Sequence, residues 1–158
     1  MKSAPPNQPE FSSLPQALGR LRVALDDAFL RSSRAVGLTP QQAELLCAAM
    51  QPLAVKDLAN SLRCDRSNVT RLVDRAYAHG HVRRRGEEED GRVTMIELTR
   101  HGERLARKFL DALEAQTAPL RATWPAKQES TAVQVLNQIS ESLDARREEP
   151  RRRKRVKP

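Results

Sequence analysis

Residues 55–98 constrain the fold of this chain more than any other stretch. Apolar residues recur there with the three- and four-residue steps of an α-helix, first over one short segment and then over a second one. The spacing predicts two short amphipathic helices whose apolar faces share one core. The residues on these two faces are Leu58, Ala59 and Leu62, followed by Val69, Leu72, Val73 and Ala76.

The flanking residues predict where the second helix begins and ends. Asp65 stands directly before it, and an Asp at that place accepts hydrogen bonds from the free N–H groups of the first turn. Gly80 follows the helix and can end it in the left-handed conformation. Two helices joined by so tight a turn are typical of a helix-turn-helix, whose second helix meets the base edges of DNA.

The exposed surface of the second helix is polar and basic. Residues 63–85 contain seven arginines and two aspartates, a local charge of +5, whereas a solvated helix more often mixes its signs. The charge of the whole chain, +8, is a weaker signal because residues 146–158 carry +6 of it. The side chains outside the apolar face are Arg66, Ser67, Asn68, Thr70, Arg71, Asp74 and Arg75.

A β-hairpin is expected directly after the second helix. Residues 81–85 and 93–98 have the composition and alternation of two strands. Gly91, within the polar and acidic loop between them, is a turn signal. Residues 53–55 can pair with the hairpin as a short third strand.

Long helices are expected on both sides of this stretch. One begins with a capping box formed by Ser13 and Gln16 and ends at Gly37. The next begins at the similar signal that starts with Thr39 and ends near Pro52. The apolar stripe of the first helix is longer than the interior of a small domain can cover, so we expect part of it to contact another chain.

Two further helices are expected after the hairpin. Thr99 caps the first, which should stop before Pro119 because proline lacks the N–H group and clashes with the preceding turn. The second runs from about Pro125 past Leu143.

Five short motifs carry a family resemblance. They are Leu58-Ala59 with Leu62, residues 65–75, residues 82–85, Asp90-x-Arg92, and Leu98-Thr99-x-x-Gly102. In this order and at this spacing they resemble the MarR family of bacterial transcription regulators, over about residues 14–143. Arg63 stands where the family usually has Gly, and a left-handed backbone there would cost about 1 kcal/mol. Residues 87–89, all Glu, make the hairpin loop more acidic than is usual in the family.

The resemblance implies a mainly α-helical fold, a winged helix-turn-helix with long terminal dimerisation helices. It implies a transcription regulator, which we expect to be a repressor, that binds a palindromic operator as a homodimer. Family members often release DNA when a small aromatic or anionic ligand enters between the dimer helices and the DNA-binding lobe. Double-stranded DNA, a second copy of the chain and such a ligand are therefore the expected partners.

The recognition helix and the hairpin supply the expected DNA contacts. Arg71 is the candidate for a bidentate contact to guanine or a clamp on phosphate, whereas Ser67 and Asn68 can reach base edges or phosphate. By resemblance, Arg92 enters the minor groove and Asp90 orients it. Arginines 75, 84 and 85 fit backbone contacts, and Asp74 is expected to hold a neighbouring arginine. The full set is Arg66, Ser67, Asn68, Thr70, Arg71, Arg75, Arg84, Arg85, Asp90 and Arg92.

The chain is expected to form one folded domain between two disordered ends. The basic C-terminal end leaves an alternative function open, that of a general nucleic-acid-binding or architectural protein that attaches to phosphates with little sequence preference. The expected boundaries are 1–12 for the disordered N-terminal segment, 13–145 for the domain, about 39–98 for its DNA-binding lobe, about 13–37 and 99–145 for its dimerisation helices, and 146–158 for the basic tail.

The remaining reactive side chains form no recognisable catalytic or metal site. His79, His81 and His101 fit no zinc signature, and the chain has no phosphate-binding glycine loop or nucleophile motif, so we expect neither an enzyme nor a cofactor. Cys47 fits a core position. Cys64 is a candidate redox residue, because flanking arginines and the start of a helix stabilise a thiolate.

The cellular location follows from signals that the sequence lacks. It shows no apolar secretory segment, no run near the ~18 apolar residues of a membrane span, and only two Cys. We therefore expect a cytoplasmic protein without a membrane partner.

Overall fold

The computed structural model describes residues 13–86, 94–125 and 127–148. The expected disordered segment 1–12, the hairpin loop 87–93 and the basic tail from residue 149 onwards lie outside the described residues. The chain forms two compact parts, residues 1–116 and residues 117–158, and each is described by itself.

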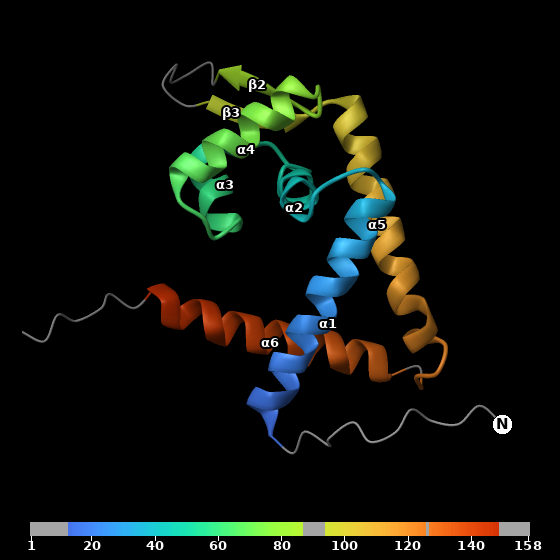
Figure 1. Ribbon diagram of the computed structural model, residues 1–158. Coiled ribbons are helices and arrows are strands. Elements are labelled where there is room, and N and C mark those ends of the chain that lie inside the picture. The colour runs from blue at the N-terminus through green and yellow to red at the C-terminus, as the bar shows by residue number, and fades with distance from the viewer. Residues whose placement is uncertain (1–12, 87–93, 126, 149–158) are drawn as a thin grey trace, which may run out of the picture. The chain divides into compact units, whose positions relative to one another are not determined.

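The first part holds the predicted helix-turn-helix and hairpin (Figure 1). A second part holds the end of α5 and all of α6. The elements are α1 (Leu14–Ala35), α2 (Pro40–Ala48), β1 (Leu53–Ala54), α3 (Val55–Ser61), α4 (Arg66–Ala78), β2 (Val82–Gly86), β3 (Thr94–Leu98), α5 (Arg100–Arg121) and α6 (Gln128–Glu148).

Side-chain caps start α2, α4 and α5, as the sequence predicts. The Gln42 N–H donates to the Thr39 hydroxyl at 3.2 Å, and the Thr39 N–H donates to the Gln42 side-chain oxygen at 2.9 Å. At α5 the Gly102 N–H donates to the Thr99 hydroxyl at 3.1 Å. The capping box predicted for α1 is wrong, since Ser13 makes no side-chain cap hydrogen bond. Pro15 favours that start instead, because its φ is already helical and it has no N–H to satisfy.

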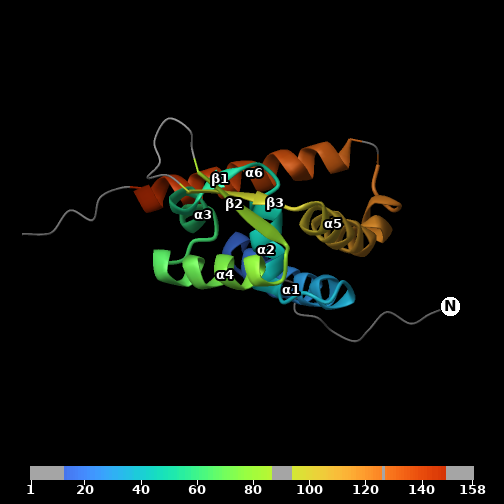
Figure 2. The same ribbon diagram turned by 90° about the horizontal axis from the view of Figure 1, so that it is seen from above.

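The three strands form one antiparallel sheet in the order β1-β3-β2. Figure 2 shows the three strands gathered in one place. In β2 and β3, Val82 pairs with Leu98 and Gly86 with Thr94. The predicted third strand is confirmed, because Leu53 pairs with Ile96 on the other side of β3. The short β1 therefore fixes the start of α3, which follows it directly, to the hairpin.

One apolar core joins the helix-turn-helix to the sheet and α5. The stripes predicted for α3 and α4 supply its centre, with Leu58, Val69 and Val73 buried. Each such side chain contributes about 1.5–3 kcal/mol when it is fully buried. The other buried apolar residues are Leu38, Ala43, Leu45, Leu46, Ala49, Ala76, Val82, Ile96, Ala106 and Phe109.

The ends of the last two helices differ from the prediction. The expectation that α5 stops before Pro119 is wrong, because the helix continues to Arg121. Proline removes a single N–H donor, and the helical bonding resumes after it, with the Ala122 N–H donating to the Ala118 carbonyl at 3.2 Å. Helix α6 ends at Glu148, three residues beyond the expected domain boundary.

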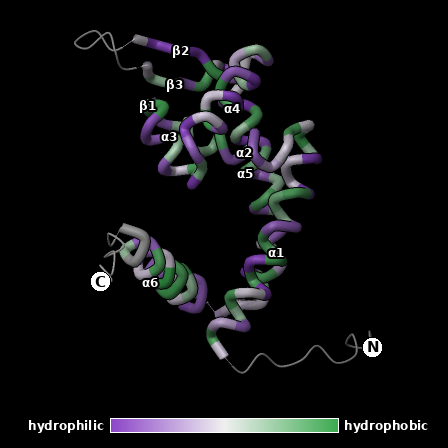
Figure 3. Tube along the Cα trace, turned by 60° about the vertical axis from the view of Figure 1, so that its left-hand side comes forward, coloured by the Kyte–Doolittle hydropathy of each residue, from purple (hydrophilic) through white to green (hydrophobic). Residues whose placement is uncertain are grey.

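Apolar side chains remain exposed on both α1 and α6. Figure 3 shows hydrophobic residues alternating with hydrophilic ones along each of these helices. The exposed residues are Leu14, Leu21, Val23 and Leu25 on α1, and Val133, Val135, Leu136 and Leu143 on α6.

Candidate nucleic-acid interface

Asp65 organises the start of α4, the predicted recognition helix. Its carboxylate accepts the Asn68 N–H at 2.9 Å, the Ser67 hydroxyl at 2.5 Å and the Asn68 side-chain amide at 2.7 Å. The hydrogen bond from Ser67, followed by that from the Asn68 backbone, lowers the pKa of Asp65 below its ordinary value. Two side chains expected to reach DNA, Ser67 and Asn68, are therefore held by the cap in the free protein.

The arginines of α4 are exposed. Arg66, Arg71 and Arg75 all lie at the surface, and none of them forms an ion pair within the described ranges. The Thr70 hydroxyl donates to the Arg66 carbonyl at 2.8 Å and so is engaged within the helix. The basic surface of α4 is anchored from below by the buried Val69 and Val73.

Glu97 neutralises two of the three arginines of β2. Its carboxylate lies 2.7 Å from Arg83 Nη2 and 3.3 Å from Arg85 Nη1, and only 8% of the residue is exposed. Alternation along β2 places Arg83 and Arg85 on one face and Arg84 on the other. Arg85, expected to contact the DNA backbone, thus already has an acidic partner on the neighbouring strand.

Arg84 links the hairpin to the recognition helix. Its guanidinium forms an ion pair with Asp74 of α4 and lies 5.6 Å from the centre of the Tyr77 ring. The prediction that Asp74 holds an arginine is confirmed. The partner comes from the sheet rather than from α4, so this pair ties the hairpin to α4.

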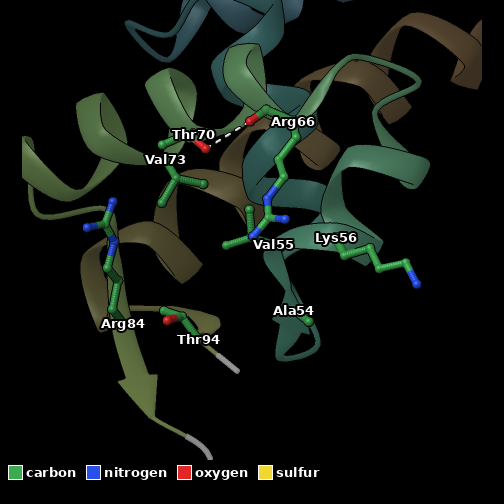
Figure 4. Close-up of a pocket in the computed structure, with 8 residues that line it drawn as sticks. All are labelled: Ala54, Val55, Lys56, Arg66, Thr70, Val73, Arg84 and Thr94. Atoms are coloured by element: carbon green, nitrogen blue, oxygen red, sulfur yellow. Dashed lines mark hydrogen bonds between the residues drawn. The ribbon is translucent and has the colours of Figure 1, made fainter. Parts of the chain in front are cut away.

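A basic pocket opens between α3, α4 and the hairpin. It encloses about 380 Å³, and Figure 4 shows Arg66 reaching from α4 towards Val55 of α3, with Arg84 on the facing strand. Lys56 of α3 lies at its rim with its ammonium group directed outwards (Figure 4). Sequence reasoning missed Lys56, although its position at the start of a helix that directly follows a short strand was a usable signal.

Arg63 confirms the strain anticipated in the turn between α3 and α4. Its φ is +52°, the left-handed region that favours glycine. The turn closes through the Cys64 N–H, which donates to the Ala59 carbonyl at 3.2 Å. Cys64, the candidate redox residue, is half-buried against the apolar core.

A second pocket lies on the other side of this turn, among α1, α2 and α5. It encloses about 410 Å³, with Phe29 and Phe109 stacked edge to face at 5.4 Å. Burial, followed by the charge of Asp26, raises the pKa of Glu44 on its wall. Burial, followed by the charge of Glu44, raises the pKa of the Cys47 thiol nearby. The lining is completed by Ala48, Ser61, Leu62, Arg63, Leu110 and Leu113.

The histidines form a row instead of a metal site. The rings of His79 and His81 lie 5.6 Å apart and those of His81 and His101 lie 5.3 Å apart. In the part of the chain that the structure describes, no group of three His, Cys, Asp or Glu side chains is placed to hold a metal ion. None of the described helices is both long and apolar enough to cross a membrane.

Comparisons with known proteins agree with the helix-turn-helix and the hairpin described above. The family model described as MarR family matches residues 38–94, which cover the helix-turn-helix and reach β3. Residues 38–94 of this chain are therefore similar to the MarR family. That family is one of transcription regulators, and its winged-helix architecture is the fold seen here.

One relative and two solved structures illustrate the similarity. The transcriptional activatory protein BadR of Rhodopseudomonas palustris is 36% identical over 77 residues, which are 46% of this chain and 44% of BadR. This chain therefore matches less than half the length of BadR. Apo MarR of E. coli has 20% identity and a TM-score of 0.68, over 82% of this chain and 98% of MarR. Bordetella bronchiseptica BpsR has 19% identity and a TM-score of 0.66, over 85% and 98%.

The tip of the hairpin belongs to residues that the structure leaves undescribed. Asp90 and Arg92, expected at the minor groove, lie there. Of the other expected contact residues, Arg66, Thr70 and Arg84 line the basic pocket. The remaining five lie on the exposed surface of α4 and β2.

Proposed function

We propose that this chain is a MarR-type regulator of transcription, which binds DNA sequence-specifically and places α4 in the major groove. The observation that carries the proposal is the set of exposed arginines on α4, which form no ion pair among the described residues and whose helix is locked into the core by its opposite face. A rigid helix with a basic outer face matches the groove in shape and charge. Arg71 is the residue assigned to base recognition.

The regulator acts as a homodimer in this proposal. Exposed Leu14, Leu21 and Leu25 lie on one stripe of α1 and form an apolar surface that a second copy would cover. A two-fold dimer presents two copies of α4, and helix-turn-helix dimers read half-sites about 34–36 Å apart. The operator is therefore expected to be a palindrome with half-sites about one helical turn apart.

Whether the protein represses or activates a gene depends on where its operator lies. A dimer bound over a promoter blocks polymerase by occupancy alone, so we propose repression. The relative BadR is a transcriptional activatory protein, which makes activation the outcome to test against. A promoter fused to a reporter gene, with and without the regulator, measures the sign directly, and higher reporter output with the regulator present would contradict repression.

We propose that a small ligand binds in the pocket among α1, α2 and α5 and thereby releases the protein from DNA. Phe29 and Phe109 give this pocket aromatic walls, and the turn before α4 forms part of its lining. In Bordetella bronchiseptica BpsR, DNA binding is regulated by 6-hydroxynicotinic acid. Thermal-shift screening with aromatic acids tests the idea, and a hit must also weaken DNA binding.

The deciding experiment is selection of duplexes from a random library by the full-length protein at about 0.15 M salt. We expect an enriched palindrome, bound at least about 10³-fold more tightly than a scrambled duplex. Affinity that is equal for all sequences would contradict the proposal and favour the alternative of a general nucleic-acid binder.

A truncation separates the two functions. Because α6 extends to Glu148, the cut belongs after that residue rather than at Ala145. The regulator proposal expects the shortened protein to keep its sequence preference. The general-binder alternative expects its affinity for every duplex to collapse together with the basic residues of the tail.

A further inference from the structure

The basic pocket beside α4 has an unbalanced charge. Three cations contribute to its lining, namely Lys56, Arg66 and Arg84, and no acidic side chain among the described residues does. Asp74 compensates only Arg84, with which it forms the ion pair. Two positive charges, on α3 and on the first residue of α4, therefore remain available to an anion.

The pocket is built on fixed elements. Lys56 follows β1 by a single residue, and Leu53 and Ala54 of β1 pair with Ile96 and Met95 of β3. The start of α4 is fixed by its Asp65 cap. The sheet and the helix-turn-helix core thus fix the backbone positions of Lys56 and Arg66, and the Lys56 side chain extends from there to the rim of the pocket.

The pocket lies on a different side of α4 from the base-reading residues. Arg66, Thr70 and Val73 stand at i, i+4 and i+7, which places them on one stripe of the helix. Arg71 lies more than a quarter of a turn away from that stripe. When Arg71 faces the groove, the pocket faces towards one of the two strands that border it.

We propose that Lys56 and Arg66 bind a backbone phosphate of the bound DNA strand at this pocket. Arg84, held by Asp74, forms the far wall and adds positive potential. Such a contact carries no sequence information but fixes the register of α4 in the groove. The inference rests on the proposed function and adds Lys56, on α3, to the residues that position the DNA.

Each phosphate contact releases counterions, so its loss has a defined signature. The slope of log K against log salt should become shallower by about 0.9 in Lys56→Ala, and the affinity should fall on the order of tenfold. Preferred and scrambled duplexes should lose the same factor, leaving their ratio unchanged. Lys56→Glu should lose more, because it places an acid against the phosphate.

The matched control is Lys108→Ala, which removes the same charge from an exposed position on α5 outside the pocket. Full-length wild type and variants are titrated with both duplexes between about 0.05 and 0.3 M salt. A Lys56→Ala slope equal to that of Lys108→Ala overturns the proposal. A change in the ratio of the two affinities also overturns it, because Lys56 would then read sequence.

A second experiment distinguishes binding of a DNA phosphate from binding of a free anion. Inorganic phosphate at millimolar concentration should leave the wild-type protein unshifted in thermal unfolding and should not compete with DNA beyond its ionic strength. Saturable competition that Lys56→Ala abolishes would assign the pocket to a free anion and overturn the DNA assignment.

The two proposals can fail separately. If the wild type shows no sequence preference, the regulator proposal fails, yet the slope change of Lys56→Ala on any duplex still tests the phosphate contact. If the preference is present and the slope is unchanged, only the phosphate contact fails.

Discussion

The backbone carbonyl of His81 packs directly against Gly102, where α5 passes the start of the hairpin. A Cβ atom at Gly102 would overlap the His81 carbonyl oxygen and also crowd the Leu98 side chain. The Thr99 N–H donates to the same carbonyl at 3.0 Å, so the oxygen cannot easily move aside. This close approach sets the distance between the wing and α5.

Gly102→Ala should therefore destabilise the protein. Helix propensity alone would favour Ala by up to about 1 kcal/mol, but the backbone overlap should outweigh it, at a net cost of about 1–3 kcal/mol. Urea unfolding followed by circular dichroism measures the change. Lys108→Ala, on the exposed side of the same helix, is the control and should stay within about 0.5 kcal/mol of wild type. Gly102→Ala at or above wild-type stability would disprove the overlap.

Replacing Arg63 separates backbone strain from side-chain contacts. Arg63 adopts a left-handed φ of +52° and has interaction partners of its own. Both Arg63→Gly and Arg63→Ala lose the side chain, but only Gly relieves the backbone. We expect the Gly variant to be about 1 kcal/mol more stable than the Ala variant in urea unfolding. Equal stabilities would show that the turn carries no such strain.

His81 should make stability depend on pH near neutrality. Burial, followed by the charges of His101 and His79, lowers its pKa below the ordinary 6.5. The unfolded chain then binds a proton more readily than the folded chain, so this contribution is complete above pH 6.5 and declines as pH falls from there towards the folded pKa. Thermal unfolding between about pH 8 and pH 5 should show a falling midpoint.

A matched variant identifies the source of that dependence. His101→Gln removes one of the two neighbouring charges while leaving His81 in place. The fall in midpoint should become shallower in this variant. An unchanged profile would show that the charge of His101 does not contribute to the lowered pKa of His81.

Arg71→Ala tests the assignment of α4 as the recognition helix. The side chain is exposed and forms no ion pair within the described ranges, so folding and dimerisation should be unaffected. Loss of a bidentate base contact should cost about 1–3 kcal/mol of discrimination and relax the preference at one base pair of each half-site. Electrophoretic mobility shifts with single-base operator variants measure this. Wild-type specificity in the variant would remove Arg71 from base reading.

Much of the local structure followed from the sequence. Asp65 and Thr39 cap helices as predicted, and Gly37 and Gly80 adopt positive φ at helix ends. These features depend on residues a few positions apart, whose hydrogen bonds form whatever the rest of the chain does. The buried stripes of α3 and α4 followed from periodicity for the same reason.

The arrangement of the DNA-binding surface was harder to predict. Charge alone predicted DNA contacts for Arg84 and Arg85 equally. The strand register instead pairs Arg85 with Glu97 and Arg84 with Asp74 in two ion pairs. Lys56 lies at the basic pocket only because β1 pairs with β3. Such assignments depend on which elements meet, and no local pattern records that.

The sequence by itself determined where the helices lie, the caps of α2, α4 and α5, the hairpin and the basic character of α4, because each rests on contacts within a few residues or on composition. Only the tertiary structure decided that Glu97 neutralises two hairpin arginines, that α5 continues through Pro119, and that Gly102 must lack a side chain. Those outcomes come from close packing between segments distant in the chain, where steric fit and charge pairing outweigh the preferences of single residues.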